Sequence, residues 1–448
     1  MRTNILLLSC ALLSIYSIAQ SGHILQGVGA VNMSMGGAST AQPLDISGAI
    51  QWNPATISVF EDKILKLDFG LFFSSPELTS SYGPLIGTTK DDRPLCVLPS
   101  LAMLWGKENS KHTFGVSAFG ISGFGVTFPE DSNYPQDLMG NPNPNYNPSL
   151  SSNSINFPQM AGGFGRIESD YILLQLGFTY SYEITNKISI GVQPNIDYAS
   201  LELMPNPTAS PSPTAGYPST NKASAVGFGG QFGLFYDSGS GLKLGASYKT
   251  TQWFSEFEFT NTYLDGSSSK NKFKMNYPAI FSLGLGYSLT DLDLALDFRR
   301  VDYENTDGFS TTGWTQTGSV SGFGWKNISI LSAGFQYKGI NKLPLRIGYT
   351  YSSNPIPSEV TFFNIPATAI IKDAFQFGLS YQINNKWTID GMAHFGDSSG
   401  TTAGPILNPM AVSSSNPLGT VPGTSVSYDM KTTLFTVGIS YKFNKSKE

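Results

Sequence analysis

Connections of two lengths alternate along this chain, and that alternation constrains the fold more than any other feature. From Lys63 onward, about fourteen runs of alternating apolar and polar residues follow one another. Tight connections such as residues 384–385 are followed by long ones such as residues 397–430, without a break in the order. A transmembrane barrel sorts its connections in this way, because its periplasmic turns are short and its extracellular loops are long. A soluble sandwich has no such reason, so we predict an all-β fold, a 14-stranded antiparallel transmembrane β-barrel.

The two faces of each run fit that fold. In residues 291–298, the leucines and Phe298 share one face, and Asp291, Asp293 and Asp297 lie on the other. The strands are expected to begin near the following residues: Lys63, Leu95, Thr113, Asp170, Lys187, Ala223, Leu242, Lys272, Asp291, Lys326, Leu343, Lys372, Lys386 and Lys431.

Composition agrees with a barrel and argues against several other classes. Charged residues make up 13 % of the chain, against about 25 % in soluble proteins. Aromatic residues also make up 13 %, while the mean hydropathy is only −0.08. Beyond the leader, no run approaches the ~18 apolar residues that a spanning helix needs. The net charge of −5 gives no reason to expect a nucleic acid as partner.

The N-terminus has the features of a secretory signal. Arg2 precedes an apolar stretch over residues 5–18, and Ser17-Ile18-Ala19 forms a small-x-small cleavage site. We therefore expect a signal peptide over residues 1–19 and a mature chain that starts at Gln20. Export without a helical anchor leaves the periplasm, the outside, or the outer membrane as a barrel. With the predicted strands, we expect a multi-pass barrel in the outer membrane of a Gram-negative cell.

Residues 27–55 differ from everything that follows them. They contain no basic residue and a single acid, Asp45, and they are rich in glycine and alanine. Such small side chains allow close backbone packing but form a poor core by themselves. We expect this block to need walls supplied by the rest of the chain. The chain would then divide into an N-terminal region over residues 20–60 and a barrel over residues 61–448.

At this point the chain resembles the FadL/TodX family of outer-membrane transporters for long-chain fatty acids and hydrocarbons. The most specific match is the N-terminal block, from Gly36-Gly37-Ala38 to Asn53-Pro54-Ala55. The further matches are Phe124-Gly125-Val126, residues 281–287 with 294–303, and residues 345–349 followed by Asn354-Pro355-Ile356-Pro357. Each piece is weak alone, and the order and spacing of the pieces carry the resemblance over nearly the whole mature chain.

The resemblance implies that residues 20–60 form a hatch, or plug, inside the lumen. The hatch motif would comprise Gly36, Gly37, Asn53, Pro54 and Ala55, in which Asn53 and Pro54 fix the turn into the first strand. It also implies uptake of hydrophobic compounds, most of all long-chain fatty acids. Ligand would bind in an external groove, pass to a lumenal pocket near the hatch, and leave sideways into the bilayer.

The third strand carries the expected lateral gate. Glycines at 120, 123 and 125 interrupt its alternation, and glycine inside a strand marks a bulge, a bend or a close approach. The resemblance therefore assigns the gate to Gly120, Gly123, Phe124 and Gly125, although barrel curvature alone would also explain the glycines. The family builds its external groove from helical loop segments, whereas residues 129–169 are rich in proline and depart from that pattern.

Candidate ligand contacts are few. Ser21, Gly22 and His23 would lie nearest the pocket if the N-terminus acts as the trigger. Arg346 alternates with apolar neighbours and should face the lumen, where it either contacts ligand or pairs with Asp293 or Asp297.

Several other functions are weighed against transport of hydrophobic compounds. A general diffusion porin should have an open, charged lumen without a hatch, and a structural or adhesive barrel should bind no apolar ligand. The three histidines, His23, His112 and His394, supply neither a catalytic set nor a zinc site, so we expect no enzyme, no metal and no cofactor. The expected partners are a hydrophobic small molecule (fatty acid or aromatic hydrocarbon) and outer-membrane lipid or lipopolysaccharide, and we expect a monomer.

Overall fold

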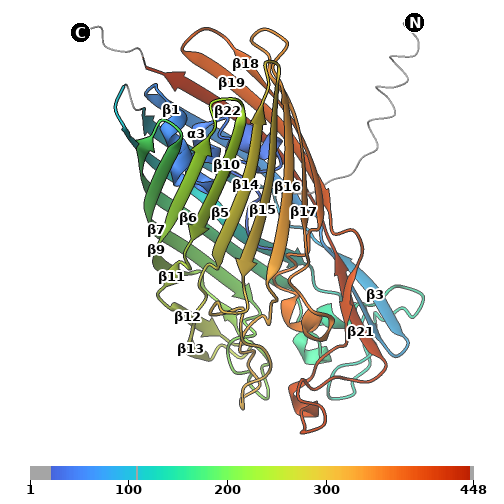
Figure 1. Cartoon of the computed structure of the whole chain (residues 1–448). Helices are drawn as coiled ribbons and strands as arrows, with labels where there is room; N and C mark the ends of the chain where they lie inside the picture. The colour runs from blue at the N-terminus through green and yellow to red at the C-terminus, as the bar shows by residue number, and fades with distance from the viewer. Residues whose placement is uncertain (1–21, 107–108, 444–448) are drawn as a thin grey trace, which may run out of the picture.

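Fourteen antiparallel strands close into a barrel around an N-terminal block in the computed structural model of the chain, which describes residues 22–106 and 109–443 (Figure 1). The barrel strands are β1 (Ile64–Ser74), β4 (Cys96–Trp105), β5 (His112–Phe128), β6 (Ile167–Thr185), β7 (Ile188–Met204), β9 (Ala223–Asp237), β10 (Leu242–Lys249), β14 (Ala279–Ser288), β15 (Leu292–Asp302), β16 (Ile328–Tyr337), β17 (Leu345–Ser352), β18 (Asp373–Gln382), β19 (Trp387–Asp397) and β22 (Lys431–Lys442). Strand β22 pairs with β1, and β9 pairs with β10, so the sheet closes.

The strands form because their alternation gives each of them one apolar face and one polar face. On β15, Leu294, Leu296 and Phe298 point outward and are exposed, as the outer surface of a membrane barrel requires. Asp293 and Asp297 of the same strand are buried inside. The predicted faces of this strand are thereby confirmed, and the predicted number of strands is also confirmed.

The two ends of the barrel differ as the loop lengths predict. Tight turns join the strands at one end, and the long connections extend from the other end, at the bottom of Figure 1. Two small sheets form in these long connections: β20 (Thr402–Gly404), β21 (Thr424–Asp429), β2 (Glu77–Tyr82) and β3 (Leu85–Lys90) make one, and β13 (Ser268–Phe273), β12 (Phe257–Thr262) and β8 (Ser219–Thr220) make the other. The remaining short elements are β11 (Trp253–Phe254), η3 (Ser154–Asn156), η4 (Gln159–Ala161), η5 (Ser358–Asn364) and η6 (Pro409–Ala411).

One predicted strand start is wrong. Lys272 does not begin a barrel strand, because it lies in β13, which pairs with β12 in an extracellular hairpin. The alternation of a hairpin outside the membrane cannot be told from that of a barrel strand by its period. The barrel strand β14 begins seven residues later, at Ala279, directly after the Tyr277-Pro278 step.

The N-terminal block lies inside the barrel as two short helices and a 3₁₀ turn. These are α2 (Gly29–Ser34), α3 (Ile46–Trp52) and η2 (Pro54–Val59), and nearly every residue in them is buried (Figure 1). Asp45 caps α3, since its side chain accepts a hydrogen bond from the amide of Gly48. The block is therefore a hatch, as predicted, and we call residues 29–58 the hatch body and residues 22–27 the N-terminal segment.

The predicted signal peptide, residues 1–19, lies outside the described residues. Among the described residues, no helix is long and apolar enough to cross a membrane.

Candidate functional site

Charged side chains of the barrel wall hold the hatch body. The Asp297 carboxylate accepts hydrogen bonds from the amides of Ser39 and Thr40, each at 2.9 Å, and from the Thr40 hydroxyl at 2.7 Å. Arg299 pairs with Asp297 at 2.6 Å and donates to the carbonyl of Gly37 at 2.7 Å. Hydrogen bonds to charged groups are roughly twice as strong as neutral ones, so this pair is a firm anchor.

The predicted hatch motif carries the turns of the hatch body. Gly36 and Gly37 have φ angles of +68° and +76°, which only glycine adopts freely. A Cβ on Gly37 would lie 1.8 Å from the Gln26 carbonyl oxygen, so this position joins the hatch body to the N-terminal segment. The Asn53 side chain accepts from the amide of Ala55 and donates to two carbonyls, while Pro54 opens η2.

A second anchor lies toward the tight-turn end of the lumen. Lys66 Nζ is 2.8 Å from Asp390 Oδ2, 3.1 Å from Asp45 Oδ2 and 3.9 Å from Asp68 Oδ1. Asp45 belongs to the hatch and the other carboxylates to the wall, so one buried ammonium ties the two parts together.

The N-terminal segment contacts the wall differently, through its backbone and through neutral side chains. Ile24 lies opposite Ser122 of β5 in an antiparallel bridge. The amide of Leu25 donates to the Ile121 carbonyl at 3.1 Å, and the Ser122 hydroxyl donates to the His23 carbonyl at 2.8 Å. The segment therefore adds a short piece of strand to β5, at the glycine-rich stretch that the sequence singles out.

The wall has a gap where this contact occurs. Strands β5 and β6 change register between Gly120 and Ser122, which leaves Ile121 as an extra, bulged residue. Strand β4 pairs with β5 only from Ser100 onward, although its pairing with β1 begins at Cys96. Residues 96–99 of β4 and residues 120–128 of β5, toward the long loops, thus face each other without ladder pairing. A cavity of about 60 Å³ occupies this gap, and the predicted gate residues Gly120, Gly123, Phe124 and Gly125 all line it.

His23 lies in a cage of aromatic rings behind the gap. Five ring centroids lie between 4.9 and 6.0 Å from that of the imidazole, and they belong to Tyr171, Tyr277, Tyr303, Phe309 and Trp325. Its Nδ1 is 2.8 Å from the Tyr303 hydroxyl, and its Nε2 has no hydrogen-bond partner among the described residues. Complete burial lowers the pKa of His23 to about 3, so the imidazole is neutral at physiological pH.

The remaining residues predicted to contact ligand lie in different places. Gly22 adjoins the cage, since a Cβ there would lie 2.6 Å from the Tyr303 hydroxyl oxygen, and Ser21 lies outside the described residues. Arg346 instead lines a polar cavity of about 460 Å³ that also contains Asp45 and Lys66, at the tight-turn end. The structure therefore does not bring Arg346 together with His23.

Arg346 also lacks the predicted carboxylate partner. Its Nε donates to Gln336 at 2.7 Å and its Nη2 to Ser380 at 2.8 Å. Asp293 pairs with Lys338, and Asp297 pairs with Arg299, so both predicted acids are already occupied. The strand register decides this, because Gln336 stands directly opposite Arg346 on β16.

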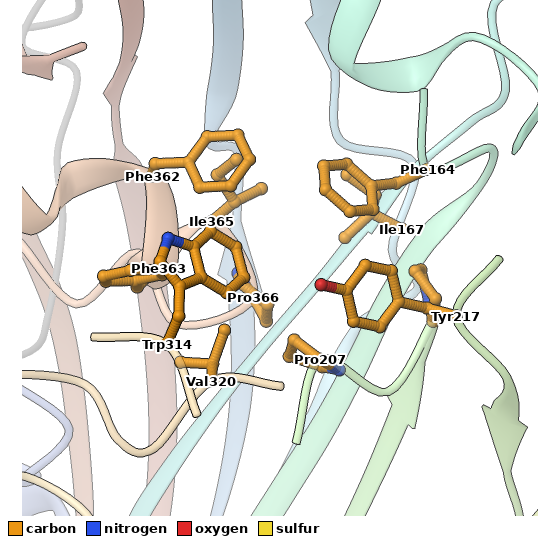
Figure 2. A pocket seen from close by; sticks show the side chains of 11 residues that line it. Phe164, Ile167, Pro207, Tyr217, Trp314, Val320, Phe362, Phe363, Ile365 and Pro366 are labelled. Atoms are coloured by element: carbon orange, nitrogen blue, oxygen red, sulfur yellow. The ribbon is translucent and has the colours of Figure 1, made fainter. Parts of the chain in front are cut away.

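A third feature is an apolar groove among the long loops. Figure 2 shows Phe164 and Tyr217 facing Trp314 and Phe362 across it. The polar atoms of two of these rings bond to loop carbonyls: Tyr217 donates to Gly318 and Trp314 donates to Leu418. The ring faces are left to line the groove, as in sites that bind apolar small molecules.

Sequence reasoning missed the anchors of the hatch body and the charged rim of the gap. Asp297 and Arg299 stand two residues apart on one inward face, which was a usable signal of a lumenal ion pair. Arg93 lines the gap cavity and pairs with Asp170, and nothing in its surroundings in the sequence indicates this. The described residues contain no group of histidine, cysteine and acidic side chains suited to a metal ion.

Comparisons with known proteins were made on sequence and on structure. Residues 151–443 match the model of the family described as outer membrane protein transport protein (OMPP1/FadL/TodX). No curated protein sequence matches the chain significantly.

Solved structures share the fold at low sequence identity. The Pseudomonas putida toluene transporter TodX is 19 % identical, with 94 % of this chain and 99 % of that chain covered and a TM-score of 0.63. A Pseudomonas aeruginosa FadL homologue is 14 % identical, with 96 % and 100 % covered and a TM-score of 0.66. The Ralstonia pickettii toluene transporter TbuX is 16 % identical, with 94 % and 99 % covered and a TM-score of 0.62.

Proposed function

Because the chain belongs to the OMPP1/FadL/TodX family of outer-membrane transport proteins, we propose that it takes up long-chain fatty acids and releases them sideways through the gap beside β5. Its place is the outer membrane, and its barrel has the fourteen strands described above. Membership of this family supports transport of hydrophobic compounds, while the fatty acid and the sideways release are our proposal.

One observation carries the proposal: the N-terminal segment is hydrogen-bonded to the wall at the gap. A ligand that displaces Ile24 and Leu25 from β5 removes the bridge that covers the bulge. The cavity in the gap and the cage around His23 share Tyr171, so the lumen and the gap are adjacent. Movement of the N-terminal segment would thus couple occupation of the lumen to opening of the wall.

The proposed route has three stages. Ligand first binds in the loop groove between Tyr217 and Trp314, which is apolar. It then enters the region of the aromatic cage and displaces His23. It leaves through the gap into the hydrocarbon region, so no apolar surface is transferred to water after capture.

A monoaromatic hydrocarbon is the second candidate ligand. The cage consists of ring side chains, and rings pack favourably edge-to-face at centroid distances of about 4.5–7 Å. A small aromatic ring could take the place of the His23 imidazole among Tyr303, Phe309 and Trp325. Two toluene transporters share this fold, so a monoaromatic hydrocarbon should be tested beside the fatty acid.

The alternatives fit the structure less well. A general diffusion porin needs an open lumen, whereas the hatch body fills this one and is bonded to the wall. A structural or adhesive barrel needs neither the groove nor the cage. The absence of enzymatic activity and of a cofactor stays a prediction, as does the monomeric state.

A reversible staple tests the proposal. Ile24 and Ser122 form a non-hydrogen-bonded antiparallel pair. The Cα atoms of such a pair are about 4.5 Å apart, a separation that a disulfide can bridge. The variant Ile24→Cys/Ser122→Cys would be made with Cys96→Ser, so that only the new pair can form a disulfide. We expect uptake of radiolabelled oleate to be lost in the oxidised form and restored by a reducing agent.

The controls are the two single-cysteine variants in the same background, which should respond to neither oxidation nor reduction. Toluene uptake, measured in parallel, decides between the two candidate ligands. Oleate uptake that is equal in the oxidised and reduced forms would refute release by movement of the N-terminal segment. Permeation of small sugars without uptake of either apolar compound would identify a porin.

A further inference from the structure

The outer surface of the wall is hollowed directly beside the gap. A hollow of about 610 Å³ extends across β22, β1, β4, β5 and β6. Its floor is formed by two small side chains that face outward, Pro99 and Ala118. Pro99 lies opposite Phe69, and Ala118 lies between Leu101 and Leu176 on the neighbouring strands. Because the surrounding leucines are exposed to the hydrocarbon region, the hollow is apolar and faces the membrane.

The hollow is continuous with the gap. Pro99 and Leu174 line both the hollow and the cavity in the gap, and Gly120 lies on the outer face opposite Leu174. A chain that emerges from the gap therefore meets this depression before it meets the rest of the outer surface.

The end of the gap nearest the loops is charged. Arg93 lines the cavity in the gap, and its Nη2 lies 2.5 Å from Oδ1 of Asp170, an outward residue of β6. Lys222 Nζ lies 2.5 Å from the other oxygen of the same carboxylate. The guanidinium lies directly against Gly125, where a Cβ would be 1.4 Å from Nη1. Two cations thus share the Asp170 carboxylate. Lys222 can stay paired with Asp170 while the Arg93 guanidinium binds a different anion.

The distances suit a single alkyl chain. Asp170 and Leu176 lie six residues apart on β6, about 20 Å at the rise of a strand. One leaflet of the hydrocarbon core is about 15 Å thick, half of the ~30 Å of the whole core. The charged rim and the apolar hollow together therefore span roughly one leaflet.

We propose that this hollow, together with Arg93 at the loop end of the gap, is an exit site that holds a transported fatty acid after it leaves the lumen. The carboxylate replaces Asp170 at the Arg93 guanidinium, and the alkyl chain lies along Pro99, Ala118 and Gly120. This inference rests on the proposed function. The occupant is the transported fatty acid because the hollow opens into the gap. A resident membrane lipid could bind the outer surface without any connection to the gap.

Filling the hollow tests the inference. Gly120→Leu adds an outward side chain where the cavity in the gap meets the hollow, beside Leu174, and the nearest atom to the new Cβ would be Leu174 Cδ2 at 3.9 Å, so the strand accommodates the change. Gly391→Leu is the matched control, an outward glycine of β19 whose Cβ would meet nothing within 4 Å. We expect Gly120→Leu to lower the rate of oleate uptake about tenfold, and Gly391→Leu to leave that rate unchanged.

A photoreactive fatty acid that carries a diazirine on its chain locates the site directly. After reconstitution and illumination, the label should be found in residues 98–101 and 118–120 of the wild type and be lost in Gly120→Leu. Arg93→Gln should lower uptake of oleate several-fold and leave uptake of the neutral oleyl alcohol unchanged, because only the carboxylate needs the guanidinium.

The outcomes separate the two proposals. No oleate uptake by the wild type would refute the proposed function. Normal oleate uptake by Gly120→Leu, with the wild type active, would refute the exit site alone. Labelling of the hollow by a diazirine phospholipid that added oleate does not displace would also overturn it, and would identify a resident lipid.

Discussion

The hatch body and the N-terminal segment are both buried in the lumen, yet they are held in opposite ways. The hatch body is fixed by charges: Asp297, Arg299 and Lys66 of the wall bind its amides, a carbonyl and a carboxylate. The N-terminal segment is held by a short backbone bridge, a serine hydroxyl and a ring cage around a neutral imidazole. The difference teaches which part can move, because buried ion pairs are costly to separate whereas a two-residue bridge is not.

Removal of the hatch-body anchor should have the largest effect. Asp297→Ala leaves the buried Arg299 without its carboxylate and removes the acceptor of two hatch amides. Breaking a buried pair in this way costs about 3–5 kcal/mol. We expect the free energy of unfolding in urea, measured on protein in lipid vesicles, to fall by that amount.

Glu258→Gln is the control for that experiment. Glu258 pairs with Lys272 on an exposed extracellular hairpin, where solvent screens an ion pair and its contribution to stability is small. If both variants lose the same stability, the Asp297 pair is no anchor and the contrast between the two regions is lost.

Acidification should loosen the N-terminal segment through His23. The pKa of docked His23 is lowered to about 3 from 6.5 by burial, so the undocked segment binds a proton more readily in this pH range. Docking should therefore weaken as the pH falls from about 6.5 toward 3, by about 1.4 kcal/mol per pH unit, or roughly 2.7 kcal/mol at pH 4.5.

Hydrogen-exchange protection of the Leu25 amide, corrected for the intrinsic pH dependence of exchange, measures this loss. His23→Phe keeps a ring in the cage but cannot be protonated, so its protection should not change over the same range. A wild type whose Leu25 protection is independent of pH would show that the cage does not control docking.

Loss of one hydroxyl should have the smallest effect. Ser122→Ala removes the hydrogen bond to the His23 carbonyl, which contributes about 1 kcal/mol. The population of undocked segment should rise about fivefold at pH 7, visible as faster exchange at Leu25. Ser247→Ala removes a hydroxyl that donates to the hatch-body carbonyl of Trp52 and is the comparison. It should leave exchange at Leu25 unchanged. Equal effects of the two variants on Leu25 would show that the N-terminal segment and the hatch body open together.

The sequence predicted the parts of this molecule that depend on local period, and it failed where partners come from distant strands. The faces of β15 follow from alternation alone, and the irregularity at Gly120 and Gly123 follows from glycine inside a strand. Lys272 was misplaced because an extracellular hairpin has the same period as a barrel strand.

The partners of Arg346 and Asp297 could not be predicted in the same way. The neighbour of Arg346 is set by the register of β16 against β17, and a shift of two residues would have supplied a different side chain. Asp297 binds the hatch across 258 positions of sequence, a contact that no local pattern encodes. The sequence therefore pointed to the stretch of β5 where the structure has its bulge and gap, but it did not indicate the charged rim at Arg93.

The bulge at Ile121 also bears on how the membrane stays sealed. Its carbonyl accepts the Leu25 amide, and when the N-terminal segment leaves, that carbonyl loses its donor within a wall that faces hydrocarbon. A buried polar group without a partner costs about 1–3 kcal/mol. If release follows the proposed sideways route, the empty open form is disfavoured by the backbone itself, and the wall should reclose between one passage and the next.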